Sequence, residues 1–312
     1  MVIVSAPGKV ILLGEHAVLY GEPCLSTAID LRTDVQAIVK GKTFRVNSYR
    51  MDSVHHTYIK AAVDNLWKGD PIHFRTRSNI LSAGGIGSSA ALTVATVGCL
   101  SMLEGDWNLD TIARQSYDVE YTAQGGGSPT DTSASTFGSG ILLSSTKGDN
   151  LLWDIKKEGR QWFIHHVDMP SLTLVVGNTK IKSKTPLQIQ KIRRFVQHSG
   201  FSKDLITDIG SLVHDGMKAL MDEDFTTFGK LMNMNQNILH TMGVSTKELE
   251  KLIHVSLKAG AYGAKLTGAG GGGSIIVLTD DPDDISQAIR DEGGVALIVK
   301  STREGVTILG SH

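Results

Sequence analysis

The sequence has only two cysteines, Cys24 and Cys99, among its 312 residues. Two cysteines cannot form a disulfide framework, and their spacing matches no zinc motif, so a disulfide-stapled domain and a structural zinc site are both excluded. Each cysteine lies among apolar residues, where a free thiol behaves as a small buried hydrophobe. This cysteine usage is typical of a protein of the reducing cytosol.

The chain also lacks an excess of charge of either sign. Its 31 Lys and Arg residues balance 32 Asp and Glu residues, which gives a net charge of −1. A near-neutral chain has no global reason to bind nucleic acid or an anionic membrane, so any anion site must be built locally from loops and helix ends.

Long apolar runs are absent too. The N-terminal stretch "MVIVSAPGK" has neither the basic start nor the apolar core of a signal peptide. The longest apolar helix candidate, residues 90–103, is too short to span a bilayer. We therefore expect a cytoplasmic protein with no membrane partner and no nucleic-acid partner.

Hydrophobic periodicity predicts an α+β fold that is rich in strands first and in helices later. Apolar or alternating runs predict strands at 2–6, 9–13, 31–39, 71–78, 140–145, 172–177, 273–278 and 295–300. Helical spacing predicts helices at 56–67, 88–103, 108–123, 186–197, 203–221, 225–242, 247–258 and 282–292. A chain of this length usually forms two domains, and we place them at residues 1–160 and 161–312.

Glycine is what the sequence has in excess, with 34 residues concentrated in three clusters. The first cluster, "AGGIGSSAA" (83–91), runs directly into a predicted helix. A helix start presents unpaired N–H groups and partial positive charge, which favours a phosphate, and its serine hydroxyls could cap the helix or ligate Mg²⁺. A plain capped helix after a loop remains the alternative.

Known nucleotide motifs fit this loop poorly. A P-loop requires a lysine after the last glycine, and none is present. A dinucleotide fingerprint could use Gly85, Gly87 and Ala90, with Glu104 as the ribose-binding acid, but the match is weak. A second match through Gly268, Gly270 and Gly273 runs into a predicted strand, so the helix that this motif requires is missing.

Charged residues stand out at three places in otherwise apolar or small-residue surroundings. Asp131 is the one acid in "GGGSPTDTSASTFG", where it could accept or orient a proton, although an Asp in a turn is the simpler interpretation. Glu120 could help to hold Mg²⁺ or could be an ordinary surface carboxylate. Lys9 and the pair Glu15-His16 flank an apolar strand, either for phosphoryl transfer or as a structural pairing.

Four segments in this order resemble the motifs of the GHMP kinase superfamily: "APGKVILLGEHAVLYG" (6–21), "GGIGSSAA" (84–91), "SPTDTSASTFG" (128–138) and "KLTGAGGGG" (265–273). The resemblance covers most of the chain, and the first segment is most similar to members that phosphorylate mevalonate. It implies an N-terminal domain like ribosomal protein S5, a ferredoxin-like C-terminal domain and an active site in the cleft between them. It also implies ATP and Mg²⁺ as cofactors, transfer to the 5-hydroxyl of mevalonate, and a homodimer.

The resemblance assigns roles to individual residues. Asp131 and Lys9 match the catalytic pair, and Ser89 and Glu120 match the Mg²⁺ ligands. The ATP-binding positions are Gly84, Gly85, Ile86, Gly87, Ser88, Ser89 and Ala90, and the substrate-binding positions are Glu15, His16, Thr185, Gly268 and Ala269. Leu81 and Ala83 depart from the proline and glycine that are common in the second motif, and Ala83 would be strained if that position needs a positive φ.

Other functions remain as rivals. A different alcohol could be the substrate within the same superfamily, such as phosphomevalonate, the 3-hydroxyl of mevalonate, homoserine or a sugar. A NAD-dependent oxidoreductase would use the Gly85 fingerprint. A non-catalytic nucleotide sensor is a third possibility, but it would have no need for Lys9, Glu120 and Asp131 together. Neither H-E-x-x-H nor G-x-S-x-G occurs, so zinc proteases and serine hydrolases have no support.

Overall fold

The computed structural model describes residues 1–81, 84–198 and 200–311, and its larger sheet carries both ends of the described chain. The strand order is β4-β3-β5-β2-β6-β8-β7, with β1 beside β2 and β13 beside β1. The strands are β1 (Val2–Leu13), β2 (Cys24–Val39), β3 (Arg45–Val46), β4 (Tyr49–Arg50), β5 (Ile72–Ser78), β6 (Gly140–Ser144), β7 (Leu151–Lys157), β8 (Arg160–Val167) and β13 (Thr307–Ser311).

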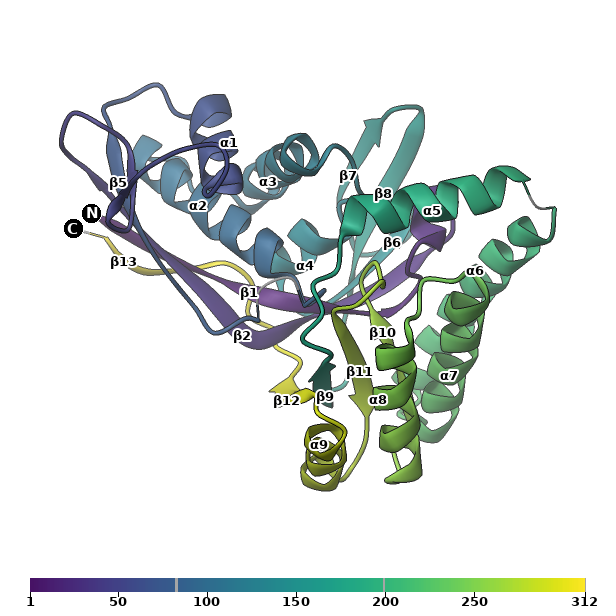
Figure 1. The fold of residues 1–312 in the computed structure, drawn as a ribbon. Helices are drawn as coiled ribbons and strands as arrows, with labels where there is room; N and C mark the ends of the chain where they lie inside the picture. The colour runs from purple at the N-terminus through teal and green to yellow at the C-terminus, as the bar shows by residue number, and fades with distance from the viewer. Residues whose placement is uncertain (82–83, 199, 312) are drawn as a thin grey trace.

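A smaller antiparallel sheet has the strand order β10-β11-β9-β12. Its strands are β9 (Thr173–Asn178), β10 (Gly263–Thr267), β11 (Ser274–Leu278) and β12 (Val295–Lys300). In Figure 1 this sheet lies below the long strands β1 and β2, and the N- and C-terminal ends lie together because β13 pairs with β1. A division of the chain at residue 160 would fall at the first residue of β8 and would separate β13 from its own sheet.

Helices cover both sheets. The elements of the first half are the 3₁₀ turn η1 (Ala17–Tyr20) and the helices α1 (Thr57–Leu66), α2 (Ser88–Glu104), α3 (Leu109–Gln124) and α4 (Thr130–Phe137). Those of the second half are α5 (Thr185–His198), α6 (Phe201–Met221), α7 (Phe225–Thr241), α8 (Lys247–Lys258) and α9 (Pro282–Asp291). In Figure 1, α1, α2 and α3 lie together on one side of β1 and β2, and α6, α7 and α8 stand beside the smaller sheet.

Helix α2 is central because it is apolar on nearly every side. Its residues from Ala90 to Ser101 are buried almost without interruption, which is the pattern of a helix enclosed by its own protein. It packs on β1, β2 and α3. This enclosure fixes the position of its N-terminal end.

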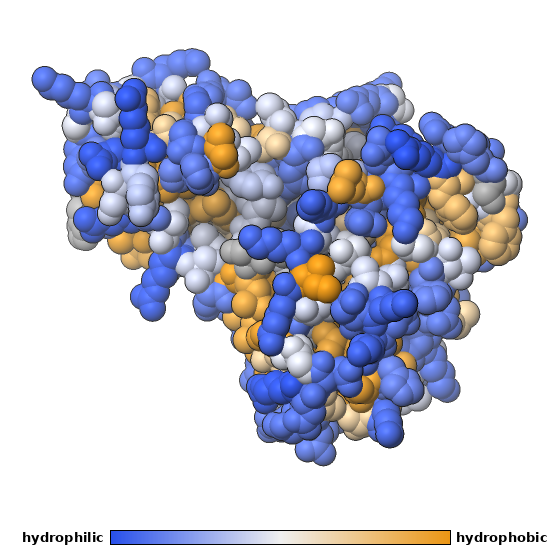
Figure 2. Space-filling view, viewed as in Figure 1, coloured by the Kyte–Doolittle hydropathy of each residue, from blue (hydrophilic) through white to orange (hydrophobic). Residues whose placement is uncertain are grey.

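One hydrophobic cluster joins the two sheets. It contains Val4 and Val10 of β1, Val94 of α2, Val176 of β9 and Ile276 of β11. Hydrophilic side chains cover most of the face in Figure 2, and apolar residues form separate small groups there. The shared core therefore holds the two sheets in a defined relation, which matters for a site built from both.

The α+β organisation predicted from periodicity is confirmed, with most helix boundaries within two residues. The strands predicted at 2–6 and 9–13 are one continuous strand, β1, whose pairing with β2 shifts register between Pro7 and Gly8. Both cysteines are buried free thiols, as predicted. Among the described residues, no helix has both the length and the apolar content to cross a membrane.

Candidate active site

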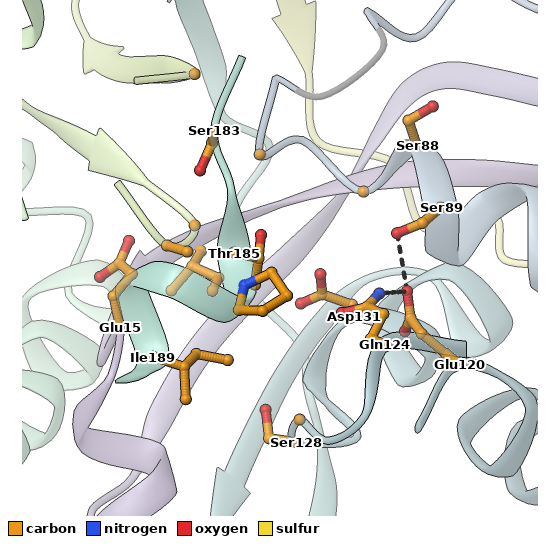
Figure 3. Close-up of a pocket in the computed structure, with 18 of the residues that line it drawn as sticks. Glu15, Ser88, Ser89, Glu120, Gln124, Ser128, Asp131, Ser183, Thr185 and Ile189 are labelled. Atoms are coloured by element: carbon orange, nitrogen blue, oxygen red, sulfur yellow. Dashed lines mark hydrogen bonds between the residues drawn. The ribbon is translucent and has the colours of Figure 1, made fainter. Parts of the chain in front are cut away.

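A cavity of about 820 Å³ opens between the two sheets. Its walls come from β1, the loop before α2, α3, α4, the segment leading into α5, and the β10–β11 loop. It is lined by most of the predicted site residues: Lys9, Glu15, His16, Gly84, Gly85, Gly87, Ser88, Ser89, Glu120, Asp131, Thr185, Gly268 and Ala269. Segments as distant in sequence as the first and third glycine motifs therefore meet around one hollow, part of which Figure 3 shows.

An ion pair forms part of the cavity wall. Lys9 Nζ of β1 lies 3.0 Å from Asp131 Oδ2, and the lysine is 2% exposed whereas the aspartate is 33% exposed. Asp131 belongs to the first turn of α4, so the interpretation of this residue as an Asp in a turn is wrong. The lysine also donates a hydrogen bond to the carbonyl oxygen of Gly85 over 3.3 Å. The pair thus presents a fixed carboxylate to the cavity, with the ammonium behind it.

Two glycines of the loop before α2, Gly85 and Gly87, lie so close to neighbouring backbone that neither position has room for a side chain. Gly87 is the N-cap of α2 with φ +80°, and no side chain caps the helix. A Cβ atom on Gly85 would lie 2.5 Å from the carbonyl oxygen of Thr267. The first-turn N–H groups of α2, which have no partner within the helix, are therefore available to an anion.

Two of the predicted nucleotide-binding residues do not line the cavity with their side chains. Ile86 and Ala90 are fully buried, and the carbonyl oxygen of Ile86 accepts a hydrogen bond from the backbone N–H of Lys9 over 3.1 Å. Their side chains support the loop, and only their backbone could face a ligand. The predicted strain at Ala83 lies outside the described residues.

Glu120 of α3 is buried beside this helix start, so the interpretation of it as a surface carboxylate is wrong. It is 6% exposed, and its Oε1 accepts hydrogen bonds from Ser89 Oγ and from Gln124 Nε2, each over 2.8 Å. Burial, followed by the negative charge of Asp131, raises the pKa of Glu120 to about 8. Gln124 was not predicted, although its place one helical turn after Glu120 could have indicated it.

This arrangement fits a divalent cation that is shared with a phosphate. Among the described residues no group of three or more His, Cys, Asp or Glu side chains could hold a metal by itself. The Ser89 hydroxyl and the Glu120 carboxylate supply oxygen atoms only, which is what Mg²⁺ prefers when phosphate and water complete its shell. A cation there would also offset the repulsion between Glu120 and Asp131.

Glu15 and His16 form the end of the cavity away from Ser89, as Figure 3 shows for Glu15. His16 Nε2 donates a hydrogen bond to the carbonyl oxygen of Ala269 over 3.0 Å. Burial lowers the pKa of His16 to about 4, so the ring is neutral near pH 7. His16 also has φ +62°, an uncommon conformation for a residue other than glycine, which strains the backbone at this turn.

Sequence reasoning missed Lys265, which forms an ion pair with Glu15. A lysine inside the stretch "GAKLT" has small and apolar neighbours that indicate burial, and a buried lysine needs a partner, but no strand was predicted there and the sequence does not say which residue the partner is. Thr185 begins α5 and lines the cavity together with Gly268 and Ala269.

The dinucleotide interpretation of the first glycine cluster is wrong. The strand before α2, β5, pairs antiparallel with the long strand β2 and parallel with the two-residue strand β3, whereas a dinucleotide-binding fold uses an extended parallel sheet. Glu104 is the last residue of α2, which places it roughly 24 Å from the glycine end of the helix. The second match does run into a strand, β11, as predicted.

Comparison with known proteins gives a consistent assignment. Residues 57–139 match the GHMP kinases N terminal domain, and residues 217–292 match the GHMP kinases C terminal domain. The chain is 31% identical to a mevalonate kinase of Pyrococcus furiosus over 98% of each chain. It is 34% identical to one of Methanothermobacter thermautotrophicus over 87% of this chain and 88% of that protein. The crystal structure of L. major mevalonate kinase in complex with R-mevalonate has a similar fold, with a TM-score of 0.80 over 96% of each chain and 24% identity.

Proposed function

We propose that this chain phosphorylates mevalonate with ATP. It belongs to the mevalonate kinase family of the GHMP kinases, and the proposal proceeds from that membership. The reaction transfers the γ-phosphoryl group of ATP to the 5-hydroxyl of (R)-mevalonate and yields 5-phosphomevalonate and ADP for isoprenoid biosynthesis. One observation carries the proposal: the Lys9–Asp131 pair lies in a cavity with a phosphate-binding helix start on one side and Glu15 and His16 on the other.

The nucleotide binds at the start of α2. The segment from Gly84 to Ala90 wraps its phosphates, with the free N–H groups and the positive end of the helix directed at them. Because α2 is enclosed in the core, these donors are fixed before ATP arrives. Such prior organisation is the main source of electrostatic catalysis.

Ser89 and Glu120 would hold Mg²⁺ beside those phosphates. When bound, the ion offsets the negative charge that spreads over the phosphate oxygens during transfer. Glu120 must lose its proton to take this role, because its buried carboxyl has a pKa of about 8. Gln124 keeps the carboxylate oriented throughout.

Asp131 orients the substrate hydroxyl and accepts its proton. The bond from the hydroxyl oxygen to the γ-phosphorus forms, and the bond from that phosphorus to the bridging oxygen of ADP breaks. Lys9 fixes the Asp131 carboxylate and stabilises the negative charge that develops on the attacking oxygen. The Lys9 ammonium is itself fixed by the carbonyl oxygen of Gly85.

The alcohol occupies the other end of the cavity, where the substrate-binding residues are Glu15, His16, Thr185, Gly268 and Ala269. The neutral His16 ring donates to Ala269, and this hydrogen bond connects the turn after β1 to the β10–β11 loop. The two walls of the substrate end therefore hold each other in place.

An ADP-release assay with ATP, Mg²⁺ and a panel of alcohols tests the proposal. The panel contains mevalonate, phosphomevalonate, homoserine and galactose, and we expect release that depends on mevalonate. Turnover of another alcohol would keep the site and change the substrate. ATP binding without turnover of any alcohol would favour a nucleotide sensor.

The same proposal includes the setting of the enzyme. We propose that it works in the cytoplasm as a homodimer, without a nucleic-acid or membrane partner. Size-exclusion chromatography with light scattering would test the homodimer. We also propose two domains, with the boundary moved from residue 160 to the segment between β8 and β9 so that the β7–β8 hairpin stays whole. Limited proteolysis would test this boundary by cleavage between β8 and β9.

A further inference from the structure

A buried ion pair links the two sheets at the substrate end of the cavity. Lys265 of β10 has no exposed surface, and Glu15, which follows β1, is 1% exposed. Lys265 Nζ donates a hydrogen bond to Glu15 Oε1 across a sequence separation of 250 residues. Two charges removed from water remain stable only when each has a partner, so these two residues depend on each other.

The two partners have different positions relative to the cavity. Glu15 lines the cavity, whereas Lys265 lies behind it and also donates to the carbonyl oxygen of Leu266 over 2.7 Å. In the part of the chain that the structure describes, the second carboxylate oxygen of Glu15, Oε2, is buried and has no hydrogen-bond partner. A carboxylate with one oxygen held from behind and the other unpaired is an acceptor that lacks its donor.

The ionised state of Glu15 depends on the charge of Lys265. Burial raises the pKa of Glu15, and Lys265 is the strongest influence in the opposite direction, ahead of Lys9. His16 is neutral near pH 7, so it supplies no counter-charge. Burial raises the pKa of the Cys24 thiol, so Cys24 adds no second negative charge. Lys9 has its own partner in Asp131.

We propose that Lys265 is a positioning residue for the reaction, which holds the Glu15 carboxylate charged and in place so that its free oxygen accepts a hydrogen bond from a substrate hydroxyl. This inference rests on the proposed function and deepens it. A negatively charged Glu15 repels the carboxylate of mevalonate and therefore meets a hydroxyl of the substrate. Asp131 takes the 5-hydroxyl, which leaves the second hydroxyl, on carbon 3, for Glu15.

The test compares Lys265→Met, Glu15→Gln and the double variant in steady-state kinetics across pH. We expect Lys265→Met to raise the KM for mevalonate by about 10- to 100-fold, the usual effect of losing a charged hydrogen bond, with the KM for ATP within about twofold of wild type. Its activity should recover as the pH rises, because Glu15 then ionises without the lysine. The double variant should be no worse than Glu15→Gln, since both changes act through one carboxylate.

The double variant also controls for folding. Lys265→Met leaves a buried acid without its partner, whereas the double variant replaces both charges with neutral groups of similar size and should fold even if the single variant does not. A Lys265→Met enzyme with wild-type KM for mevalonate and a wild-type pH profile would overturn the inference. So would equal increases in both KM values, or additive effects of the two substitutions, because each indicates a structural role alone.

A measurement without turnover separates this inference from the proposed function. Wild-type activity on mevalonate tests the function by itself, and if another alcohol is the substrate, the variants are measured with that alcohol. Carbon-13 NMR of the glutamate carboxyl groups, with the Glu15 resonance assigned by its loss in Glu15→Gln, reports the ionisation directly. The resonance should titrate at higher pH in Lys265→Met, and an unchanged titration would contradict the role of Lys265 whatever the substrate.

Discussion

At the scale of single residues, Asp131 is the most informative position because it is the partly exposed member of an otherwise buried ion pair. Asp131→Asn keeps the shape of the side chain and removes its ability to take a proton. We expect kcat to fall by about 10²- to 10⁴-fold, the usual contribution of general base catalysis. Binding of a non-hydrolysable ATP analogue, measured by calorimetry, should stay near the wild-type value. A variant with near-wild-type kcat would remove Asp131 from the role of base.

His16 gives a prediction about pH. Its folded pKa of about 4 lies below the ordinary value of 6.5, so the unfolded chain binds more protons between these values, and stability is lost as the pH falls through this window. The free energy of unfolding of wild type relative to His16→Gln should fall by about 2 kcal/mol between pH 7 and pH 4.5, at ~1.4 kcal/mol for each pKa unit. Urea titrations at a series of pH values measure this difference, and a pH-independent difference would mean that the pKa of His16 is the same in the folded and the unfolded chain.

Individual site residues also show which parts of the candidate site could be predicted from the sequence and which could not. Lys9, Glu15, His16 and Asp131 were predicted to share a pocket, and the structure lines one cavity with all four. Lys265 was missed because nothing local relates it to a glutamate 250 residues away. The burial of Glu120 was not predicted, although Glu120 follows Ile112, Ala113 and Tyr117 at helical spacing on the face of α3 that packs inward.

At the scale of elements, the loop between β5 and α2 needs glycine at position 85 for two separable reasons: a positive φ and a close approach to neighbouring backbone. Gly85 has φ +77°, and a Cβ atom added to it would lie 2.5 Å from the carbonyl oxygen of Thr267. Gly105, at the other end of α2, has a similar φ of +79°, but a Cβ atom added there would meet nothing within 4 Å. Gly85→Ala should therefore lower stability more than Gly105→Ala, by about 1 kcal/mol or more beyond a shared backbone cost of about 1–2 kcal/mol. Only Gly85→Ala should raise the KM for ATP.

Denaturant melts and ATP kinetics on the two alanine variants measure this difference. Equal losses of stability with unchanged kinetics in both variants would show that the close approach between the two glycine loops has no role in nucleotide binding.

Helix α4 shows why some elements could not be predicted. Its sequence, "TDTSASTF", has small and β-branched polar residues with weak helix propensity and no amphipathic pattern. The helix forms because Thr132, Ser133 and Ala134 are completely buried by tertiary contacts. The helices α8 and α9 were predicted almost to the residue, because their buried apolar residues recur at helical spacing in the sequence.

At the scale of the whole molecule, the C-terminal strand tests how the site depends on the sheet. β13 pairs with Val2 to Ser5 of β1, the strand that carries Lys9 farther along. Truncation after Val306 should lower Tm by several degrees because the edge of β1 loses its partner, while kcat well below Tm stays near wild type. Leu309→Ser is the matched control, since this side chain is 59% exposed and the substitution keeps the backbone pairing.

Thermal melts with activity measurements at low temperature read both effects. A truncated enzyme that is inactive while still folded would show that β13 acts on the site directly, and an unchanged Tm would show that its pairing contributes little to stability.

The proposed function requires that phosphate is transferred to the 5-hydroxyl of mevalonate in the cavity between the two sheets. The most direct measurement is phosphorus–proton correlation NMR of the product formed from ATP, Mg²⁺ and (R)-mevalonate. We expect a new phosphate ester coupled to the protons on carbon 5, formed about 10²-fold or more slowly by Asp131→Asn. A phosphate at another position, or no ester from mevalonate at all, would contradict the proposed function.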